Sequence, residues 1–245
     1  MSGEKLSILV TSGGTISKID DVRCIGNLSK GTTGALIAEE FLKKGDIVHY
    51  MFGGNAARPL RKNLTANPHK KLAEEIEKVK KAYCDFRKYS DNLKEYPFLT
   101  FDDYSNRLKT LLEKEKIDVV VLAAAVSDYS AKQTAGKISS DLERMSIELE
   151  RNPKIISLIK KWNPRVFQVG FKLLPDSETK EMVETAYKHG TKSNSDLTVA
   201  NTINPHFSIS RTAIITSEKK VYEIDRQDLA EKLVELVHER AKKNR

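Results

Sequence analysis

A glycine-rich segment near the start of the chain combines residue types that suit the binding of an anion. The apolar run ILV at 8–10 leads into glycines at positions 13, 14, 26, 31 and 34, with Asn27 between them. A glycine-rich loop after a strand lets the backbone approach phosphate oxygens closely. The spacing fits neither the GxGxxG dinucleotide fingerprint nor a P-loop ending in GK and Ser or Thr. The segment therefore predicts an anion site of another design.

A second candidate residue is Asp128, which follows the apolar run VVVLAAAVS. Ligands of open α/β sheets bind at the carboxyl ends of strands, where this carboxylate would lie. The five histidines show no metal-ligand spacing, and no GxSxG nucleophile elbow occurs. The two cysteines, Cys24 and Cys84, are expected to be reduced thiols. Any reaction would therefore depend on positioned substrates and electrostatics.

Alternating strand and helix patterns predict the framework that positions these residues. The segments KLSILV, TTGALIAEEFLKKGD and IVHYMF form a strand–helix–strand unit, which implies a parallel sheet. Further strands are expected at 98–101, 118–126, 145–150, 165–171 and 196–201, further helices at 68–89, 102–117, 152–162, 177–190 and 226–243, and a terminal hairpin at 211–216 and 220–224. The sequence thus predicts an α/β fold, a three-layer, Rossmann-like, doubly wound and mostly parallel sheet.

The chain is expected to form a single domain, residues 1–245. Within it, residues 58–105 are a less certain insert, in which the helix at 68–89 places Leu72, Ile76, Val79 and Tyr83 on one face. Residues 129–142 are polar and are expected to form a mobile surface loop.

Composition and charge exclude some classes of function. No apolar run reaches the ~18 residues of a membrane span, and the N-terminus lacks a signal-peptide pattern, so we expect a cytoplasmic protein without membrane contact. The formal net charge of +8 is compatible with nucleic acid or with small polyanions. Because the lysines are scattered and no aromatic residues alternate with a basic stripe, nucleic-acid binding is not expected.

Seven segments, taken together, resemble the phosphopantothenoylcysteine synthetase family (phosphopantothenate–cysteine ligase). They are VTSGGT, DDVRCIGNLSKGTTG, AAAVSDY, GKISS, NPKII, VGFKLLPD and DLTVAN, and they follow the order of the family. Each alone is weak, but the ordered set covers nearly the whole chain. The resemblance implies a short, stand-alone ligase of coenzyme A biosynthesis.

The resemblance also implies a reaction. The carboxylate of 4'-phosphopantothenate would attack the α-phosphate of a nucleoside triphosphate and release pyrophosphate. The amine of L-cysteine would then attack the acyl nucleotidylate and release the nucleoside monophosphate. Both nucleophiles would be substrates, which agrees with the lack of a protein nucleophile.

Residue roles are carried over from the matching motifs. Catalytic roles fall on Asn27, which would support the oxyanion, and on Lys137, which would close over the α-phosphate. The resemblance assigns the nucleotide to Gly14, Ser29, Gly31, Gly34, Ala123, Phe171, Lys188, Lys192 and Asn201. It assigns the phosphopantothenate to Arg23, Ala124, Ala125 and Asp128, with Asp128 also expected to hold Mg²⁺.

The identity of the nucleotide is less certain than the reaction. Family members use CTP or ATP, and Ser139 and Ser140 in GKISS stand where many fused bacterial enzymes have lysines. We expect CTP, with ATP as the alternative. Family members are homodimers, in which 58–105 and 129–142 are candidates to cover the partner's site. The competing hypotheses are a nucleotide-dependent oxidoreductase and a basic nucleic-acid-binding module on the same fold.

Overall fold

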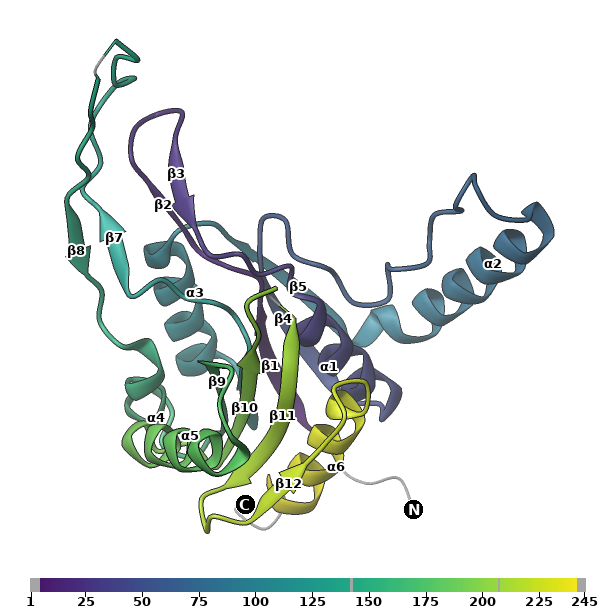
Figure 1. Cartoon of the computed structure of the whole chain (residues 1–245). Coiled ribbons are helices and arrows are strands. Elements are labelled where there is room, and N and C mark those ends of the chain that lie inside the picture. The colour runs from purple at the N-terminus through teal and green to yellow at the C-terminus, as the bar shows by residue number, and fades with distance from the viewer. Residues whose placement is uncertain (1–4, 142, 207, 242–245) are drawn as a thin grey trace.

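An eight-stranded sheet forms the centre of the computed structural model, which describes residues 5–141, 143–206 and 208–241 (Figure 1). The strands lie in the order β12-β11-β10-β9-β6-β1-β4-β5. Their bounds are β1 Ser7–Ser12, β4 Ile47–Gly53, β5 Leu93–Phe98, β6 Val119–Leu122, β9 Phe167–Pro175, β10 Leu197–Ile203, β11 Ile209–Thr216 and β12 Val221–Glu223. The six strands β10, β9, β6, β1, β4 and β5 are parallel to one another. Strand β11 runs antiparallel to β10, and β11 and β12 form the predicted terminal hairpin.

Helices cover both faces of this sheet, because its central strands are apolar on both sides. In β1, Ile8 and Val10 face the core under α1 (Thr32–Lys43) and α6 (Leu229–Ala241), while Leu9 faces the opposite core. That second face is covered by α3 (Phe101–Lys114), α4 (Ile159–Trp162) and α5 (Thr179–Ser193). The three-layer, doubly wound prediction is confirmed.

The elements next to the sheet edge differ from their predicted positions. The strand expected at 98–101 is β5 at Leu93–Phe98, an edge strand that tolerates Pro97 because its outer side needs no partner. Thr100 then caps α3 by accepting a hydrogen bond from Asp103 N, with Asp103 in turn bonding the Thr100 N–H. The helix expected at 152–162 consists of a 3-10 turn, η2 (Ile155–Ser157), and the short α4.

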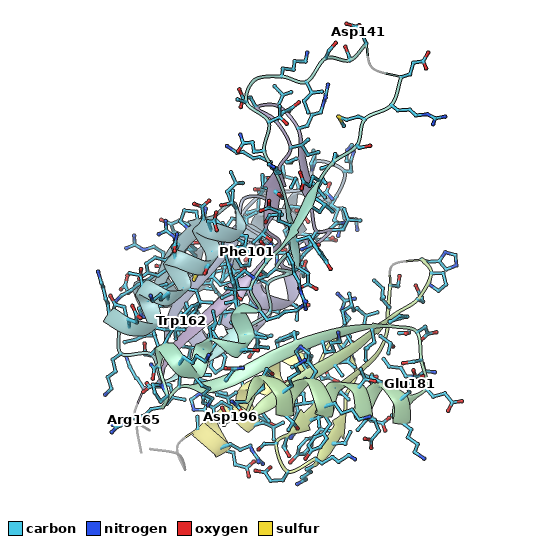
Figure 2. All side chains as sticks on the ribbon, turned by 90° about the vertical axis from the view of Figure 1, so that its left-hand side faces the viewer. Phe101, Asp141, Trp162, Arg165, Glu181 and Asp196 are labelled. Carbon is cyan, nitrogen blue, oxygen red and sulfur yellow. The ribbon has the colours of Figure 1, made fainter. Side chains whose placement is uncertain are left out.

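Two arms extend from the carboxyl edge of the sheet (Figure 1). The first is the hairpin of β2 (Ile16–Lys18) and β3 (Cys24–Gly26), which the sequence analysis missed. The second, the long arm, comprises residues 129–141 and 143–151 and contains β7 (Tyr129–Ala131) paired with β8 (Leu149–Arg151). Of the strand predicted at 145–150, only residues 149 and 150 lie in a strand, β8, and this strand belongs to the arm rather than to the main sheet. Asp141 lies near its tip in Figure 2.

The insert helix α2 (Leu72–Tyr89) projects away from the sheet (Figure 1). The helix prediction is confirmed, but much of its apolar face is exposed: Leu72, Ile76 and Tyr83 are 72%, 52% and 57% exposed, whereas Val79 is half-buried. A short 3-10 turn, η1 (Ser90–Asn92), connects α2 to β5. Within the described ranges, no helix has the length and apolar character needed to cross a membrane.

We predict that Phe41→Ala lowers the free energy of unfolding by about 3–5 kcal/mol, because the ring is fully buried between α1 and its neighbours and leaves a cavity. Leu36→Ala on the same helix, where the side chain is 40% exposed, serves as the control and should cost much less. Urea unfolding measures both, and equal losses would contradict this packing.

Candidate active site

The loop after β1 and the segment after β6 lie against each other at the carboxyl edge of the sheet. Ala125 donates its N–H to Gly13 O at 2.7 Å, and Thr15 donates its N–H to Ala125 O at 3.2 Å. The Thr15 hydroxyl also accepts the Ser127 N–H at 3.0 Å. These contacts extend the β1–β6 pairing beyond the sheet, so the Gly-rich loop and the AAAVSD motif form one rigid rim.

The side chain of Asn27 lies on this rim. Its Nδ2 donates to Ala125 O at 2.8 Å and lies 3.3 Å from Ser127 Oγ. Gly14 leaves room for this approach, since a Cβ there would lie 3.0 Å from Asn27 O. The Asn27 side chain is exposed, and its Oδ1 has no hydrogen-bond partner within the described residues. The amide is therefore oriented by the protein and accessible to a ligand.

The N-terminus of α1 opens beside Asn27. Gly31 takes a left-handed conformation with φ of 69° and provides no side-chain cap, and the first turn contains no acidic residue. Ser12 Oγ donates to Gly31 O at 2.8 Å, which fixes the start of the helix on β1. Ser29 is anchored through its N–H to Asn27 O at 2.9 Å. Free N–H groups and a positive dipole end favour an anion at this position.

Asp128 is exposed and forms an ion pair with Lys154, with Nζ 2.5 Å from Oδ1. Asn152 secures the same corner by donating from Nδ2 to Ser127 O at 2.9 Å, and its backbone N–H bonds Asp128 O. The sequence analysis did not assign Asn152 or Lys154 to the site, although both belong to the NPKII motif. The corner thus presents one carboxylate and one ammonium side by side.

Arg23 and Lys137 lie on the two arms. Arg23 Nη2 donates to Ile138 O at 3.2 Å, and Nη1 lies 3.4 Å from Asp20 Oδ2, so its guanidinium contacts the long arm. Lys137 is exposed and has no hydrogen bond or ion pair within the described residues. Asp20, which the sequence analysis did not single out, is buried between the two arms.

The other predicted nucleotide and substrate residues lie farther along the sheet edge. Ala124 donates its N–H to Thr11 Oγ1 at 3.3 Å, while Ala123 and Phe171 pack against the core under α1 and α6. Asn201 Oδ1 accepts from Thr212 Oγ1 at 2.9 Å across the β10–β11 pair. Lys188 and Lys192 are exposed on α5, and within the described residues neither contacts Asn27.

His189 on α5 has a half-buried ring whose Nδ1 is buried without a hydrogen-bond partner. Burial lowers the pKa of His189 below its ordinary value of 6.5, and the charges of Lys172, Lys154 and Lys192 lower this pKa further. Lys154 and Lys192 therefore share one positively charged neighbourhood with His189. A neutral histidine among these lysines was not apparent from the sequence.

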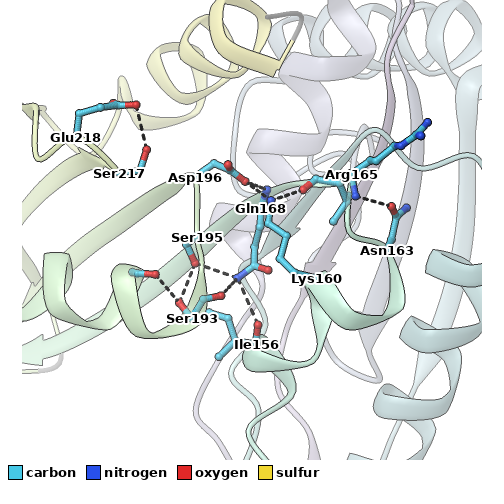
Figure 3. A network of polar contacts seen from close by, with 12 residues as sticks. Ile156, Lys160, Asn163, Arg165, Gln168, Ser193, Ser195, Asp196, Ser217 and Glu218 are labelled. Carbon is cyan, nitrogen blue, oxygen red and sulfur yellow. Dashed lines mark hydrogen bonds and ion pairs between the residues drawn. The ribbon is translucent and has the colours of Figure 1, made fainter. Parts of the chain in front are cut away.

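A polar network around Gln168 lies next to the end of α5 (Figure 3). Gln168 Nε2 on β9 donates to Ser193 O and Ser195 Oγ, both at 3.0 Å, and approaches Ile156 O at 3.3 Å. These bonds connect η2, β9 and the end of α5. The segment that carries Asn152 and Lys154 is thereby fixed against α5.

Cys24 and Cys84 are unpaired and exposed. Among the described residues, no cluster of three His, Cys, Asp or Glu side chains could hold a metal ion.

Residues 3–85 and 102–241 match the family described as the DNA/pantothenate metabolism flavoprotein C-terminal domain. The chain belongs to this family. The resemblance drawn from the ordered motifs is confirmed by this match. The unmatched stretch, 86–101, lies inside the predicted insert and includes the end of α2, η1 and β5.

Known relatives of this family member extend the comparison. The coenzyme A biosynthesis bifunctional protein CoaBC of Thermococcus kodakarensis is 31% identical over 92% of this chain, which spans 49% of that protein. Phosphopantothenate–cysteine ligase 1 of Arabidopsis thaliana is 30% identical and covers 81% of this chain and 70% of its own length. The crystal structure of the DNA/pantothenate metabolism flavoprotein from Streptococcus pneumoniae superposes with a TM-score of 0.74 at 30% identity, covering 95% of this chain and 98% of that one. The chain spans about half the length of the archaeal relatives it matches.

We predict that Gly34→Ala destabilises the protein by about 1–3 kcal/mol, because the new Cβ would lie 2.5 Å from Ser12 Oγ and 2.7 Å from Ser12 Cβ. Ser12→Gly in the same variant should restore much of the loss. Gly54→Ala is the control, since its Cβ would meet its nearest neighbour at 3.9 Å. If all variants unfold at the same urea concentration, the close approach of α1 to β1 is wrong.

We predict that NMR titration of His189 gives a pKa below 6.5, because burial and then the nearby lysines disfavour the imidazolium. The unfolded state binds this proton more readily, so the contribution to stability is complete above pH 6.5 and declines as the pH falls through 6.5 toward the folded pKa. Lys172→Met should raise the pKa, whereas Lys180→Met at the other end of α5 should leave it unchanged. A wild-type pKa at or above 6.5 would rule out this environment.

Proposed function

We propose that the chain is a phosphopantothenate–cysteine ligase of coenzyme A biosynthesis, which forms 4'-phosphopantothenoyl-cysteine through an acyl nucleotidylate. Membership of the family and the names of its relatives support the activity. The single observation that carries the proposal is the exposed Asn27 amide, held on Ala125 O beside the uncapped N-terminus of α1. An anion and an acyl carbonyl can meet at this position.

The phosphates would bind at the start of α1. Free backbone N–H groups near Gly31 and Gly34, the loop at Gly14 and the Ser29 hydroxyl offer donors to phosphate oxygens. Lys137 would reach the α-phosphate from the long arm, because its ammonium is exposed and without a partner among the described residues. Both features stabilise negative charge that develops when the substrate carboxylate attacks the α-phosphate.

Asn27 would act in the second half-reaction. Its Nδ2 is already bound to Ala125 O, so the amide plane is fixed before substrate arrives. The second Nδ2 hydrogen makes only a long contact of 3.3 Å with Ser127 Oγ, so it is the donor that would turn to the oxyanion formed when the cysteine amine attacks the acyl carbonyl. Positioning of the two substrates contributes the rest of the acceleration, through a high effective molarity.

Asp128 would contact phosphopantothenate and Mg²⁺. Its exposed carboxylate fits a role as one ligand of an ion that arrives with the triphosphate, the usual way in which Mg²⁺ binds, although Lys154 now occupies one oxygen. When bound, the ion would neutralise phosphate charge. Arg23, Ala124 and Ala125 would contact phosphopantothenate as the family resemblance implies.

We further propose CTP as the nucleotide, with ATP as the alternative. Phe171 would pack against the base, and Asn201 and Ala123 would contribute contacts at the neighbouring strand ends. Lys192, which shares the neighbourhood of His189 and Lys154, is better placed than Lys188 to meet an anion that reaches Asp128.

We propose a cytoplasmic homodimer. Exposed apolar side chains on the hairpin and the long arm, and those on α2 in the 58–105 insert, support a protein partner. The 129–142 loop remains the other candidate to cover the partner's site, though residue 142 lies outside the described residues.

We predict that pyrophosphate release requires 4'-phosphopantothenate and is faster with CTP than with ATP in the presence of Mg²⁺. Asn27→Asp should lower complete turnover at least 100-fold and accumulate the acyl nucleotidylate, because the oxyanion loses its donor while the first step keeps its groups. Asn106→Asp, on the exposed side of α3, is the control and should behave as the wild type. The assay compares both nucleotides with and without L-cysteine.

The possible outcomes of this assay lead to different conclusions. Pyrophosphate release with both nucleotides at equal rates would reject CTP preference but keep the ligase. Absence of pyrophosphate release with either nucleotide would reject the proposed function. Salt-sensitive binding of nucleic acid in that case would favour the basic binding module instead.

A further inference from the structure

Asp20 is a buried carboxylate at which the two arms of the structure meet. Its exposed fraction is 1%, and it lies in the turn between β2 and β3. Oδ1 accepts the backbone N–H groups of Val22 at 2.9 Å and Arg23 at 2.6 Å, which closes that turn. Oδ2 accepts the N–H of Ile138 at 3.1 Å, across 118 positions of sequence. Oδ1 thus serves the turn alone, whereas Oδ2 joins the two arms and also lies 3.4 Å from Arg23 Nη1.

Further contacts bind the same stretch of the long arm to the hairpin. Thr134 donates its N–H to Ile19 O at 2.9 Å, and Asp21 donates its N–H to Gly136 O at 3.2 Å. Nearer the sheet, Ala131 donates its N–H to Ser17 Oγ at 2.6 Å. The first half of the long arm is therefore hydrogen-bonded along the hairpin.

The contacts converge on the residues that flank Lys137. Gly136, on one side, accepts from the Asp21 N–H. Ile138, on the other side, has both backbone groups engaged, because its N–H bonds Asp20 and its carbonyl accepts from Arg23. The backbone of Lys137 is held at both neighbours, while its side chain is exposed.

Asp20 is suited to this task as an anion. Burial acts to raise the pKa of Asp20, but the N–H donors of Val22, Ile138 and Arg23, together with the Arg23 charge, lower this pKa below its ordinary value of 3.8. The carboxylate is then ionised at neutral pH. Hydrogen bonds from N–H groups to an ionised oxygen are stronger than those to a neutral acceptor.

We infer that Asp20 is a positioning residue for Lys137: it fixes the long arm on the hairpin so that the lysine is presented to the α-phosphate. The inference rests on the proposed ligase function, in which Lys137 contacts the reacting phosphate. Asp20 itself touches no reacting atom. It acts through the backbone of Ile138.

Asp20→Asn tests the inference because the two oxygens of Asp20 do different things. The asparagine Oδ1 can keep both bonds of the turn, whereas its Nδ2 replaces the acceptor of Ile138 with a second donor. Asp21→Asn is the matched control: it removes the same charge one residue away, from an exposed side chain that has no hydrogen bond or ion pair within the described residues. Asp20→Ser is a second variant, since its short hydroxyl can still serve the turn but cannot reach the other arm.

Hydrogen exchange of the unliganded protein is the first readout. The amides of residues 134–138 should exchange at least 10-fold faster in Asp20→Asn than in the wild type, while the core amides of β1 and β6 remain protected. Asp21→Asn should match the wild type. Unchanged exchange at 134–138 in both Asp20 variants would overturn the inference, whatever the enzyme's activity.

A double-mutant cycle with Lys137→Ala is the second readout. Asp20→Asn should slow nucleotide-dependent pyrophosphate release by about 10- to 100-fold, the usual penalty for misplacing a reacting group. In a Lys137→Ala background the same change should have little further effect, because the group that it positions is gone. Losses that multiply would show that Asp20 acts elsewhere and would overturn the inference. A wild-type enzyme without pyrophosphate release would instead reject the proposed function, and the exchange result would still stand.

Discussion

The close approach of backbone segments at the carboxyl edge of the sheet is the constraint on which the rest of the site depends. A Cβ on Gly53 would lie 2.5 Å from Gly14 O, and one on Gly31 would lie 2.8 Å from both Ser12 Oγ and Ala56 Cβ. The loops after β1 and β4 and the start of α1 can meet only because these positions lack side chains. Interiors are packed to crystal density, so the glycines are a geometric requirement of the rim as well as a means of contacting phosphate.

This close packing of the backbone determines the positions of the polar side chains at the rim. With the loop after β1 pressed against the segment after β6, Asn27 reaches Ala125 O and Ser127 bonds Thr15. The same rim extends into the two arms, which carry the polar side chains away from the sheet. The backbone groups at the ends of these strands would otherwise be unpaired. Their hydrogen bonds to the neighbouring loops satisfy them and hold the exposed side chains in place.

The sequence could predict features that depend on local periodicity or on strand ends, and it could not predict contacts between distant polar segments. The β1–α1–β4 unit follows from apolar spacing, and Asp128 was placed at the edge because a buried strand precedes it. The short β2, β3 and β7 have no comparable pattern, and the alternating pattern at 145–150 overlaps β8 only at its end. The contact between the two arms depends on Asp20 and Ile138, whose separation of 118 positions no local rule can bridge. The exposed face of α2 shows the converse failure, since an amphipathic pattern indicates a helix but not what packs against it.

The side chains proposed to meet substrate are exposed, and the side chain that positions one of them is buried. The groups that would meet substrate, Asn27 and Lys137, are exposed, whereas the group that holds the arm carrying Lys137 is buried and charged. A buried carboxylate is costly unless every oxygen is satisfied, and Asp20 meets that condition only when both arms are in place. Folding of the hairpin and docking of the long arm are therefore coupled. The backbone on both sides of Lys137 is hydrogen-bonded to the hairpin, so the flexible side chain would follow the phosphate through the reaction.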